Sequence, residues 1–175
     1  SCWAACRQAR AAKALGLRCM VSEDSVRRAL KAMELPASET WMRQSLMDSV
    51  RDALTGPWIL DLDATIKPLY GHQEGAEVGY NPHKPGRPSH VLHTFWIGNL
   101  RLVLDAVLTS GKQHTSGHAK APLKRLLDEL GERKPALLRG DCGYGNQDII
   151  DICEERALAY LLRLRQTANV KRLIE

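Results

Sequence analysis

Two carboxylates stand in a stretch of sequence that is otherwise apolar and typical of a strand. The stretch is WILDLDATIKPLYG, residues 58–71, and the acids are Asp61 and Asp63. An ionised carboxylate in an apolar interior costs several kcal/mol unless a cation or hydrogen-bond donors compensate it. Because side chains alternate along a strand, both acids point to one face, and Leu60 and Leu62 point to the other. We therefore expect a compensating group opposite the two acids.

A further carboxylate, Asp141, ends the short strand predicted for ALLRGD, where the glycine-rich turn CGYG begins. Functional groups of α/β sheets are often found at such strand ends. If the two strands are neighbours, Asp63 and Asp141 converge, and a divalent cation is the least costly way to keep both ionised. The alternatives are that Asp61 belongs to a salt bridge within the sheet and that Asp141 stabilises the turn.

The elements that position these acids begin after a helical segment, residues 1–55. Ser22 can cap a first helix, which Pro36 would end, and Ser38 can start a second, which a Gly-Pro pair would end. Both helices are basic on their polar sides. That pattern fits contact with DNA, and it equally fits an ordinary solvated surface.

From residue 56 the pattern changes to strands, and the predicted fold class is α/β with a mixed five-stranded sheet. The predicted strands cover residues 58–65, 91–97, 100–108, 136–141 and 157–164. A hairpin at Gly98-Asn99 and right-handed crossovers give the order 3-2-1-4-5, with the second strand antiparallel to its neighbours. A helix is expected over residues 120–130 and another after CGYG, while the connection over residues 71–90 is too rich in turn residues for a regular element.

Three segments carry a family resemblance: DLDATIKPLYGHQEG, GYNPHKPGRPSH and LLRGDCGYGNQDII. In this order and spacing the chain resembles, over about residues 57–170, the catalytic region of the DDE transposases of bacterial insertion sequences. The resemblance implies an RNase H-like fold with Asp63 and Asp141 as catalytic, metal-binding acids, and Asp61 is the fallback for the first of them. It also implies phosphoryl transfer on double-stranded DNA with two Mg²⁺ or Mn²⁺ ions, and a homodimer on paired transposon ends.

The resemblance leaves the third acid of the Asp-Asp-Glu triad without a counterpart. In the family this Glu lies on a helix well downstream, whereas Asp148, Asp151 and Glu155 form one polar stripe that is typical of a solvated helix face. Glu175 is the last residue and cannot be assigned to a helix. We therefore expect residues 56–175 to be a catalytic core truncated before the third acid, inactive alone. The alternatives are a decayed copy that only binds DNA, or another RNase H-like nuclease.

Lys84 and Arg87 are the candidate DNA-binding residues outside the acids. They stand in the turn-rich stretch GYNPHKPGRPSH, where proline and glycine lower the cost of ordering the chain. Two cations on a stiff loop fit contacts to DNA phosphates, although an ordinary surface loop explains them as well on chemistry alone.

Composition agrees with this interpretation without requiring it. The chain has 175 residues and a formal charge of +5, a mild indication of a polyanionic partner. Its five cysteines have no paired spacing, which favours reduced thiols in the cytoplasm. No apolar run is long enough to span a bilayer, so we expect no membrane partner.

Overall fold

The computed structural model describes residues 12–13, 16, 18, 20–112 and 115–174. The chain divides into two compact units, Ser1–Met42 and Arg43–Glu175, and the boundary falls inside helix α3, Leu35–Val50. Much of the predicted helical segment 1–55 thus lies in the first unit, and its first eleven residues are outside the described part. Among the described residues, no helix combines the length and the apolar character that a bilayer-spanning segment needs.

The N-terminal helices begin and end differently from the prediction. Helix α2, Glu23–Ala32, is capped as expected, because the Ser22 side chain accepts a hydrogen bond from the Ser25 backbone N–H at 3.2 Å. The predicted roles of Pro36 and Ser38 are wrong. Helix α3 already begins at Leu35, so Pro36 lies in its first turn, where the missing N–H has no helical acceptor to lose. The Ser38 hydroxyl instead donates to the Leu35 carbonyl oxygen at 2.9 Å.

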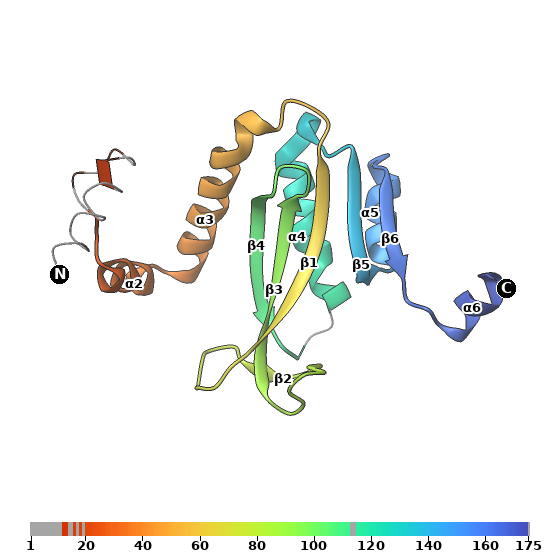
Figure 1. Cartoon of the computed structure of the whole chain (residues 1–175), viewed down its shortest axis with the longest axis horizontal. Coiled ribbons are helices and arrows are strands. Elements are labelled where there is room, and N and C mark those ends of the chain that lie inside the picture. The colour runs from red at the N-terminus through yellow and green to blue at the C-terminus, as the bar shows by residue number, and fades with distance from the viewer. Residues whose placement is uncertain (1–11, 14–15, 17, 19, 113–114, 175) are drawn as a thin grey trace. The chain divides into compact units, whose positions relative to one another are not determined.

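The sheet of the second unit has the predicted order (Figure 1). Its strands are β1 Ile59–Pro68, β2 Glu77–Val78, β3 Pro88–Ile97, β4 Leu102–Ser110, β5 Leu137–Gly145 and β6 Tyr160–Leu164. The order β4-β3-β1-β5-β6 corresponds to the predicted 3-2-1-4-5. Strand β3 is antiparallel to β1 and β4, whereas β1, β5 and β6 are parallel. The predicted α/β, RNase H-like architecture is therefore confirmed.

The prediction of no regular element over residues 71–90 is wrong in part. The two residues of β2 pair with Ser89 and Pro88, and β3 itself begins at Pro88. Strand β2 pairs with β3 on the same side as β4 does. It is the sixth strand of the sheet. A strand of two residues is too short to show hydrophobic alternation in the sequence. Its position depends instead on its pairing with β3.

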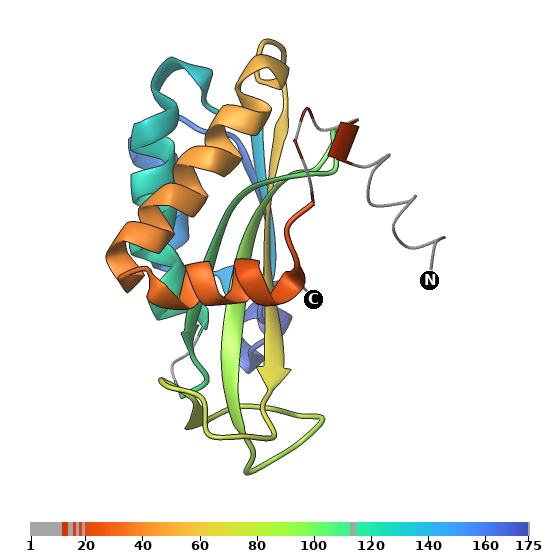
Figure 2. The same cartoon turned by 90° about the vertical axis from the view of Figure 1, so that its left-hand side faces the viewer.

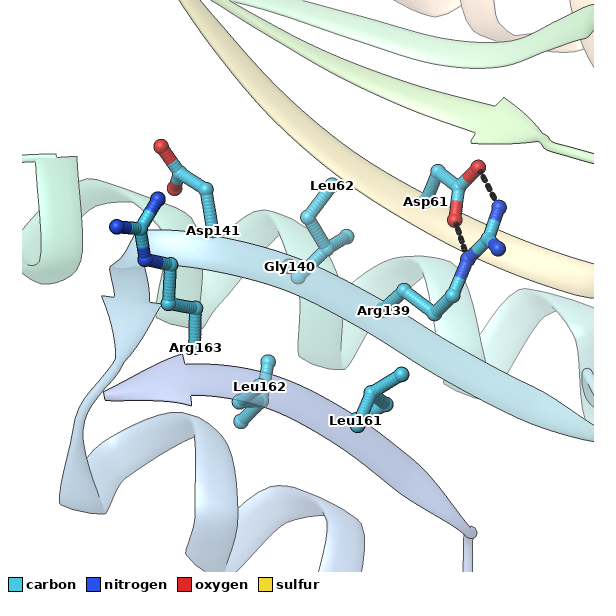
Figure 3. A pocket seen from close by; sticks show the side chains of 8 residues that line it. All are labelled: Asp61, Leu62, Arg139, Gly140, Asp141, Leu161, Leu162 and Arg163. Carbon is cyan, nitrogen blue, oxygen red and sulfur yellow. Dashed lines mark hydrogen bonds and ion pairs between the residues drawn. The ribbon is translucent and has the colours of Figure 1, made fainter.

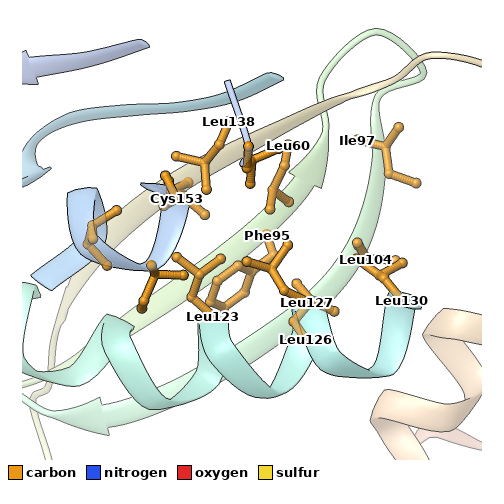
Figure 4. Packing of buried hydrophobic residues seen from close by; sticks show 14 of the residues in the cluster. Leu60, Phe95, Ile97, Leu104, Leu123, Leu126, Leu127, Leu130, Leu138 and Cys153 are labelled. Atoms are coloured by element: carbon orange, nitrogen blue, oxygen red, sulfur yellow. The ribbon is translucent and has the colours of Figure 1, made fainter. Parts of the chain in front are cut away.

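Helices α4, Thr115–Leu130, and α5, Gln147–Glu155, cover one face of the sheet (Figure 2). Helix α4 begins five residues before its predicted start. Its leucines pack against alternate residues of the strands, as Figure 4 shows for Leu60, Phe95 and Leu138. Asp61 and Asp63 alternate with Leu60 and Leu62 and therefore point to the opposite face, which we call the site face.

An ion pair with a buried carboxylate links α4 to β4 on the covered face. The Asp105 side chain is only 3% exposed and accepts hydrogen bonds from the Arg125 guanidinium and from the Ala106 backbone N–H, both at 2.8 Å. A buried carboxylate is tolerated only when it is paired in this way. The second unit also contains the 3-10 turns η1, Arg51–Ala53, and η2, Gly131–Arg133, and the short helix α6, Ala168–Ile174.

Candidate active site on the polar face of the sheet

The parallel register of β1 and β5 brings Asp63 and Asp141 together. Asp61 pairs with Arg139, and Leu62 pairs with Gly140, where the ladder between the two strands ends. Asp63 and Asp141 are the next residues on the two strands, and both are exposed. Strands in a sheet lie about 4.8 Å apart, so the two carboxylates occupy neighbouring positions on the site face.

Arg139 is the group opposite Asp61. Its Nε and Nη2 atoms donate to the two carboxylate oxygens of Asp61, each at 2.6 Å, in a bidentate ion pair (Figure 3). The hydrogen bonds to Asp61, and then its negative charge, raise the pKa of the Arg139 guanidinium. A bidentate pair uses both oxygens of Asp61. Asp61 is therefore a salt-bridged sheet residue, and it would have to give up Arg139 in order to bind a metal ion.

Gly98, in the turn between β3 and β4, leaves the space that this ion pair occupies. A Cβ atom at Gly98 would lie 2.2 Å from Asp61 Oδ2 and 3.1 Å from Arg139 Nη2. The Gly98 backbone N–H donates to the Ile59 carbonyl oxygen at 2.8 Å, so the turn cannot easily move away. A side chain at this position would displace the Asp61 carboxylate.

Asp63 and Asp141 form no ion pair within the described part of the chain. The Thr65 hydroxyl donates to Asp63 Oδ2 at 3.5 Å, and the Gly143 backbone N–H donates to Asp141 Oδ1 at 2.9 Å. Such single contacts leave several lone pairs of each carboxylate free. Two adjacent carboxylates with free oxygens are suited to hold a hard divalent cation.

The position of Asp141 differs from the prediction in one respect. Strand β5 continues through CGYG to Gly145, so Asp141 lies within the strand, at an irregularity in its pairing with β6 between Gly140 and Gly145. The contact to the Gly143 N–H is the local stabilising role named above as an alternative for Asp141. It uses one oxygen and is compatible with metal binding.

Tyr144 and His93 form a buried polar pair beneath the acids. The Tyr144 hydroxyl lies 3.2 Å from His93 Nδ1, and His93 Nε2 lies 3.3 Å from the Thr109 hydroxyl. Burial, and then the negative charges of Asp63 and Asp141, raise the pKa of the Tyr144 phenol above its usual value. Burial, and then the nearby His118, lower the pKa of His93 to about 4. The phenol stays protonated and the imidazole neutral, so neither adds charge to the site.

Sequence reasoning missed Arg139, Tyr144 and His93. For Arg139 a signal was present: it stands two residues before Asp141, so it shares a face with that acid, as Asp61 does with Asp63. The role of Tyr144 was hidden because its segment was predicted to be a turn. His93 has no metal-ligand spacing with another histidine, and only the fold reveals its partner.

The third carboxylate is not found among the described residues, which contain no group of three or more His, Cys, Asp or Glu side chains able to hold a metal ion. Asp148 pairs with Lys120 at 2.6 Å, and Asp151 accepts a hydrogen bond from Gln147 at 2.6 Å. These acids belong to α5, on the covered face of the sheet. Glu175 lies outside the described residues.

Lys84 and Arg87 are brought together in a separate cluster around Tyr70. Lys84 Nζ donates to the Tyr70 hydroxyl and lies 4.9 Å from the ring centroid, and Arg87 Cζ lies 4.4 Å from the same centroid. The hydrogen bond from Lys84, and then the charges of Lys84 and Arg87, lower the pKa of the exposed Tyr70 phenol. Because β1 continues from Asp63 to Pro68 before this loop, the cluster lies beyond the strand that carries the acid.

The Asp61–Arg139 pair should depend on Gly98. The two side chains are 28% and 44% exposed, so a double-mutant cycle of Asp61→Asn and Arg139→Gln should give a coupling energy of about 1 kcal/mol. In the Gly98→Ala background the coupling should fall close to zero, because the new methyl group occupies the position of Asp61 Oδ2. Urea unfolding measures both cycles. The exposed Arg156–Asp128 pair, at 2.7 Å, is the control whose coupling should not change.

His93 should make the stability depend on pH. Its pKa is about 4 in the folded state and 6.5 in the unfolded state, so only the unfolded chain takes up this proton between those values. Stability should therefore fall as the pH drops from about 6.5 to about 4, by an amount on the order of 3 kcal/mol, and this contribution should then level off. His93→Gln should flatten that part of the profile in urea titrations at a series of pH values. An unchanged profile would show that other groups cause the dependence.

Solved structures with a similar fold are distant from this chain. One is the Mos1 mariner paired-end complex with Mn, at 14% identity and a TM-score of 0.39 over 95% of this chain and 65% of that one. Another is the BIV integrase catalytic core domain, at 10% identity and a TM-score of 0.39 over 68% and 62% of the two chains. A third is the piggyBac transposase synaptic complex with hairpin DNA, at 9% identity and a TM-score of 0.49 over 89% of this chain and 33% of that one. The chain spans less than two thirds of each.

The family assignment comes from a match over nearly the whole sequence. No curated protein matches the chain. Residues 8–175 match the family model described as Transposase DDE domain group 1. This match includes β1 with Asp63 and β5 with Asp141, and the protein belongs to the group 1 family of transposase DDE domains.

Proposed function

We propose that this domain performs phosphoryl transfer on DNA in transposition, with Asp63 and Asp141 as its metal-holding acids. The observation that carries the proposal is the arrangement of charge on β1 and β5. Asp63 and Asp141 occupy neighbouring positions and keep free oxygens, while Asp61 is neutralised by Arg139. This contrast favours Asp63 over Asp61 as the first acid. Membership of the DDE family supports the same chemistry.

The donor set fits Mg²⁺ or Mn²⁺. Both ions prefer oxygen ligands, and a divalent cation relieves the repulsion between two adjacent carboxylates. Since the described residues supply two such acids and no third, we infer that water completes the coordination in this chain. Affinity for the ion should consequently be weak.

The residues of the site would act on a phosphodiester as follows. When bound, the metal ions would activate the attacking oxygen and stabilise the leaving one. The oxygen of water or of a DNA 3′-hydroxyl forms a bond to phosphorus and gives up its proton, while the bond from phosphorus to the 3′-oxygen breaks and that oxygen gains a proton. Asp63 and Asp141 would hold the ions at this point. The Gly143 N–H orients the Asp141 carboxylate, and Arg139 keeps Asp61 away from the ions.

The cluster of Tyr70, Lys84 and Arg87 supports a second role, binding of double-stranded DNA, which does not require catalysis. Lys84-Pro85-Gly86-Arg87 forms a turn in which the Arg87 N–H donates to the Lys84 carbonyl oxygen at 3.3 Å and Gly86 has φ +75°. Pro followed by Gly with positive φ is typical of a type II turn, which brings its first and fourth residues within about 7 Å of each other.

The loop around this turn is ordered before any ligand binds. The buried Asn81 side chain accepts hydrogen bonds from the backbone N–H groups of His83 and Lys84, at 3.2 and 3.1 Å. Ordering two cations in advance lowers the entropy cost of binding. We therefore propose that Lys84 and Arg87 contact phosphates of the DNA backbone, which carry no sequence information directly.

The metal proposal predicts a stabilisation by Mn²⁺ that depends on both acids. At a Mn²⁺ concentration about ten times the Kd, the gain in stability should be about 1.4 kcal/mol, or a few degrees in Tm. Asp63→Asn or Asp141→Asn should abolish the shift and can raise the Tm without metal by removing repulsion. Differential scanning calorimetry with and without Mn²⁺ measures both effects.

Asp61→Asn is the matched control for this experiment, because it changes an acid on the same strand and the same face. It should keep the Mn²⁺ shift. If the Asp63→Asn/Asp141→Asn double variant shifts as much as the wild type does, these carboxylates have a structural role and the proposed catalysis fails. If only Asp61→Asn abolishes the shift, Asp61 is the first acid.

The loop proposal predicts a loss of salt-dependent DNA binding. Binding of a fluorescein-labelled DNA duplex in EDTA should weaken in Lys84→Gln/Arg87→Gln, and the slope of log K against log salt should decrease by about two, as for two lost phosphate contacts. The matched control, Lys124→Gln/Arg133→Gln, removes two exposed charges from α4 and η2. Equal effects of the two double variants on fluorescence anisotropy would show that only net charge matters.

A further inference from the structure

The site face carries two rows of side chains across strands β1, β5 and β6. On β6, Leu161 pairs with Arg139 and Leu162 with Gly140. The first row is therefore Asp61, Arg139 and Leu161. The next site-face positions on the three strands give the second row, Asp63, Asp141 and Arg163.

A pocket opens on this face between β1, β5 and β6 (Figure 3). Its polar lining consists of Asp61, Arg139, Asp141 and Arg163, and Leu161 forms part of its apolar wall. In Figure 3 the Arg163 side chain extends beside Asp141, at the opposite end of the pocket from the Asp61–Arg139 pair. The pocket is thus lined both by Asp141, a candidate metal-holding acid, and by Arg163, a cation on β6.

The two arginines of the pocket differ in what their charges already do. Arg139 is held by both oxygens of Asp61. Arg163 is exposed and forms no ion pair within the described residues. The β5–β6 ladder is interrupted between Gly140 and Gly145, so Asp141 and Arg163 are not held as a regular cross-strand pair. The five N–H donors of Arg163 remain available to a ligand.

We propose that Arg163 binds a phosphodiester group of DNA in this pocket, beside Asp141. A guanidinium group presents two parallel N–H donors that match the two non-bridging oxygens of a phosphate. Leu161 supplies apolar surface at the other end of the pocket, beside Arg139. Arg163 is then a substrate-binding residue of the proposed transferase site, so this inference rests on the proposed function. No covalent step is assigned to it.

The competing explanation is that Arg163 only offsets the negative charge of Asp63 and Asp141 at a distance. In that case any cation at residue 163 would serve, and a DNA ligand would not distinguish arginine from lysine. If Arg163 binds the phosphate through two parallel N–H donors, lysine cannot fully replace it, because lysine keeps the charge and lacks the paired donors. Arg163→Lys therefore separates the two explanations, and Arg163→Gln removes charge and donors together.

The experiment measures the affinity of the whole chain for a fluorescein-labelled DNA duplex by anisotropy, in Ca²⁺ and across a salt series. Arg163→Gln should bind about tenfold more weakly than wild type, because a hydrogen bond to a charged group is lost. Its salt slope should decrease by about one, the loss of one phosphate contact. Arg163→Lys should keep the slope and lose part of the affinity. Lys124→Gln, which removes an exposed charge from α4 on the other face of the sheet, should leave both values unchanged.

Three outcomes would overturn the inference: a wild-type chain that does not bind the duplex, an Arg163→Gln variant that binds no more weakly than Lys124→Gln, or an Arg163→Lys variant equal to wild type. The Mn²⁺ shift in Tm provides the separate readout. If Arg163→Gln keeps that shift and also keeps its DNA affinity, only this inference fails. If Asp63→Asn/Asp141→Asn keeps the shift while Arg163→Gln loses DNA affinity, the phosphate site stands without the proposed metal chemistry.

Discussion

The parallel register between β1 and β5 is the constraint on which the site depends. It places Arg139 opposite Asp61 and makes Asp63 and Asp141 the next residues on the two strands. A shift of one residue would turn one set of side chains to the other face and would bury acids under α4 and α5. The apolar residues that alternate with the acids, such as Leu60 and Leu138, oppose this shift because both are fully buried in the core. Packing on the covered face thereby fixes the chemistry of the site face.

The carboxylates on the two faces of the sheet differ in burial and in pairing. On the covered face, Asp105 is almost fully buried and fully paired, so removing Arg125 would leave an unpaired buried charge. On the site face, Asp63 and Asp141 are exposed, and water stabilises them at little cost to folding. Tyr144 and His93 are both buried, each 1% exposed. Their pKa shifts keep both groups uncharged near neutral pH, so the interior tolerates them directly beneath two negative charges.

Sequence reasoning predicted the parts of the fold that depend on local pattern. Alternation placed Asp61 and Asp63 on one face, and the hairpin and crossover rules gave the sheet order, which is confirmed. Boundaries that depend on distant partners were not predictable. The segment CGYG has the glycine content of a turn, yet it continues β5 because β6 pairs with it again at Gly145. Arg139 could be recognised as the partner of Asp61 only once the register was known, and no pattern within 71–90 indicates β2.

Geometry explains why Arg139 neutralises Asp61 and leaves Asp141 free. Residues directly opposite on neighbouring strands are separated by about 4.8 Å, whereas residues two apart on one strand are separated by nearly 7 Å. Asp61 is directly opposite Arg139, and Asp141 is two residues along the same strand. Gly98 adds the space in which the closer pair forms with both oxygens engaged. The charges of Asp61 and Arg139 cancel, so the first row of the site face carries no net charge. The second row holds two acids and one arginine. Negative charge is concentrated at Asp63 and Asp141, where a divalent cation would gain most from binding.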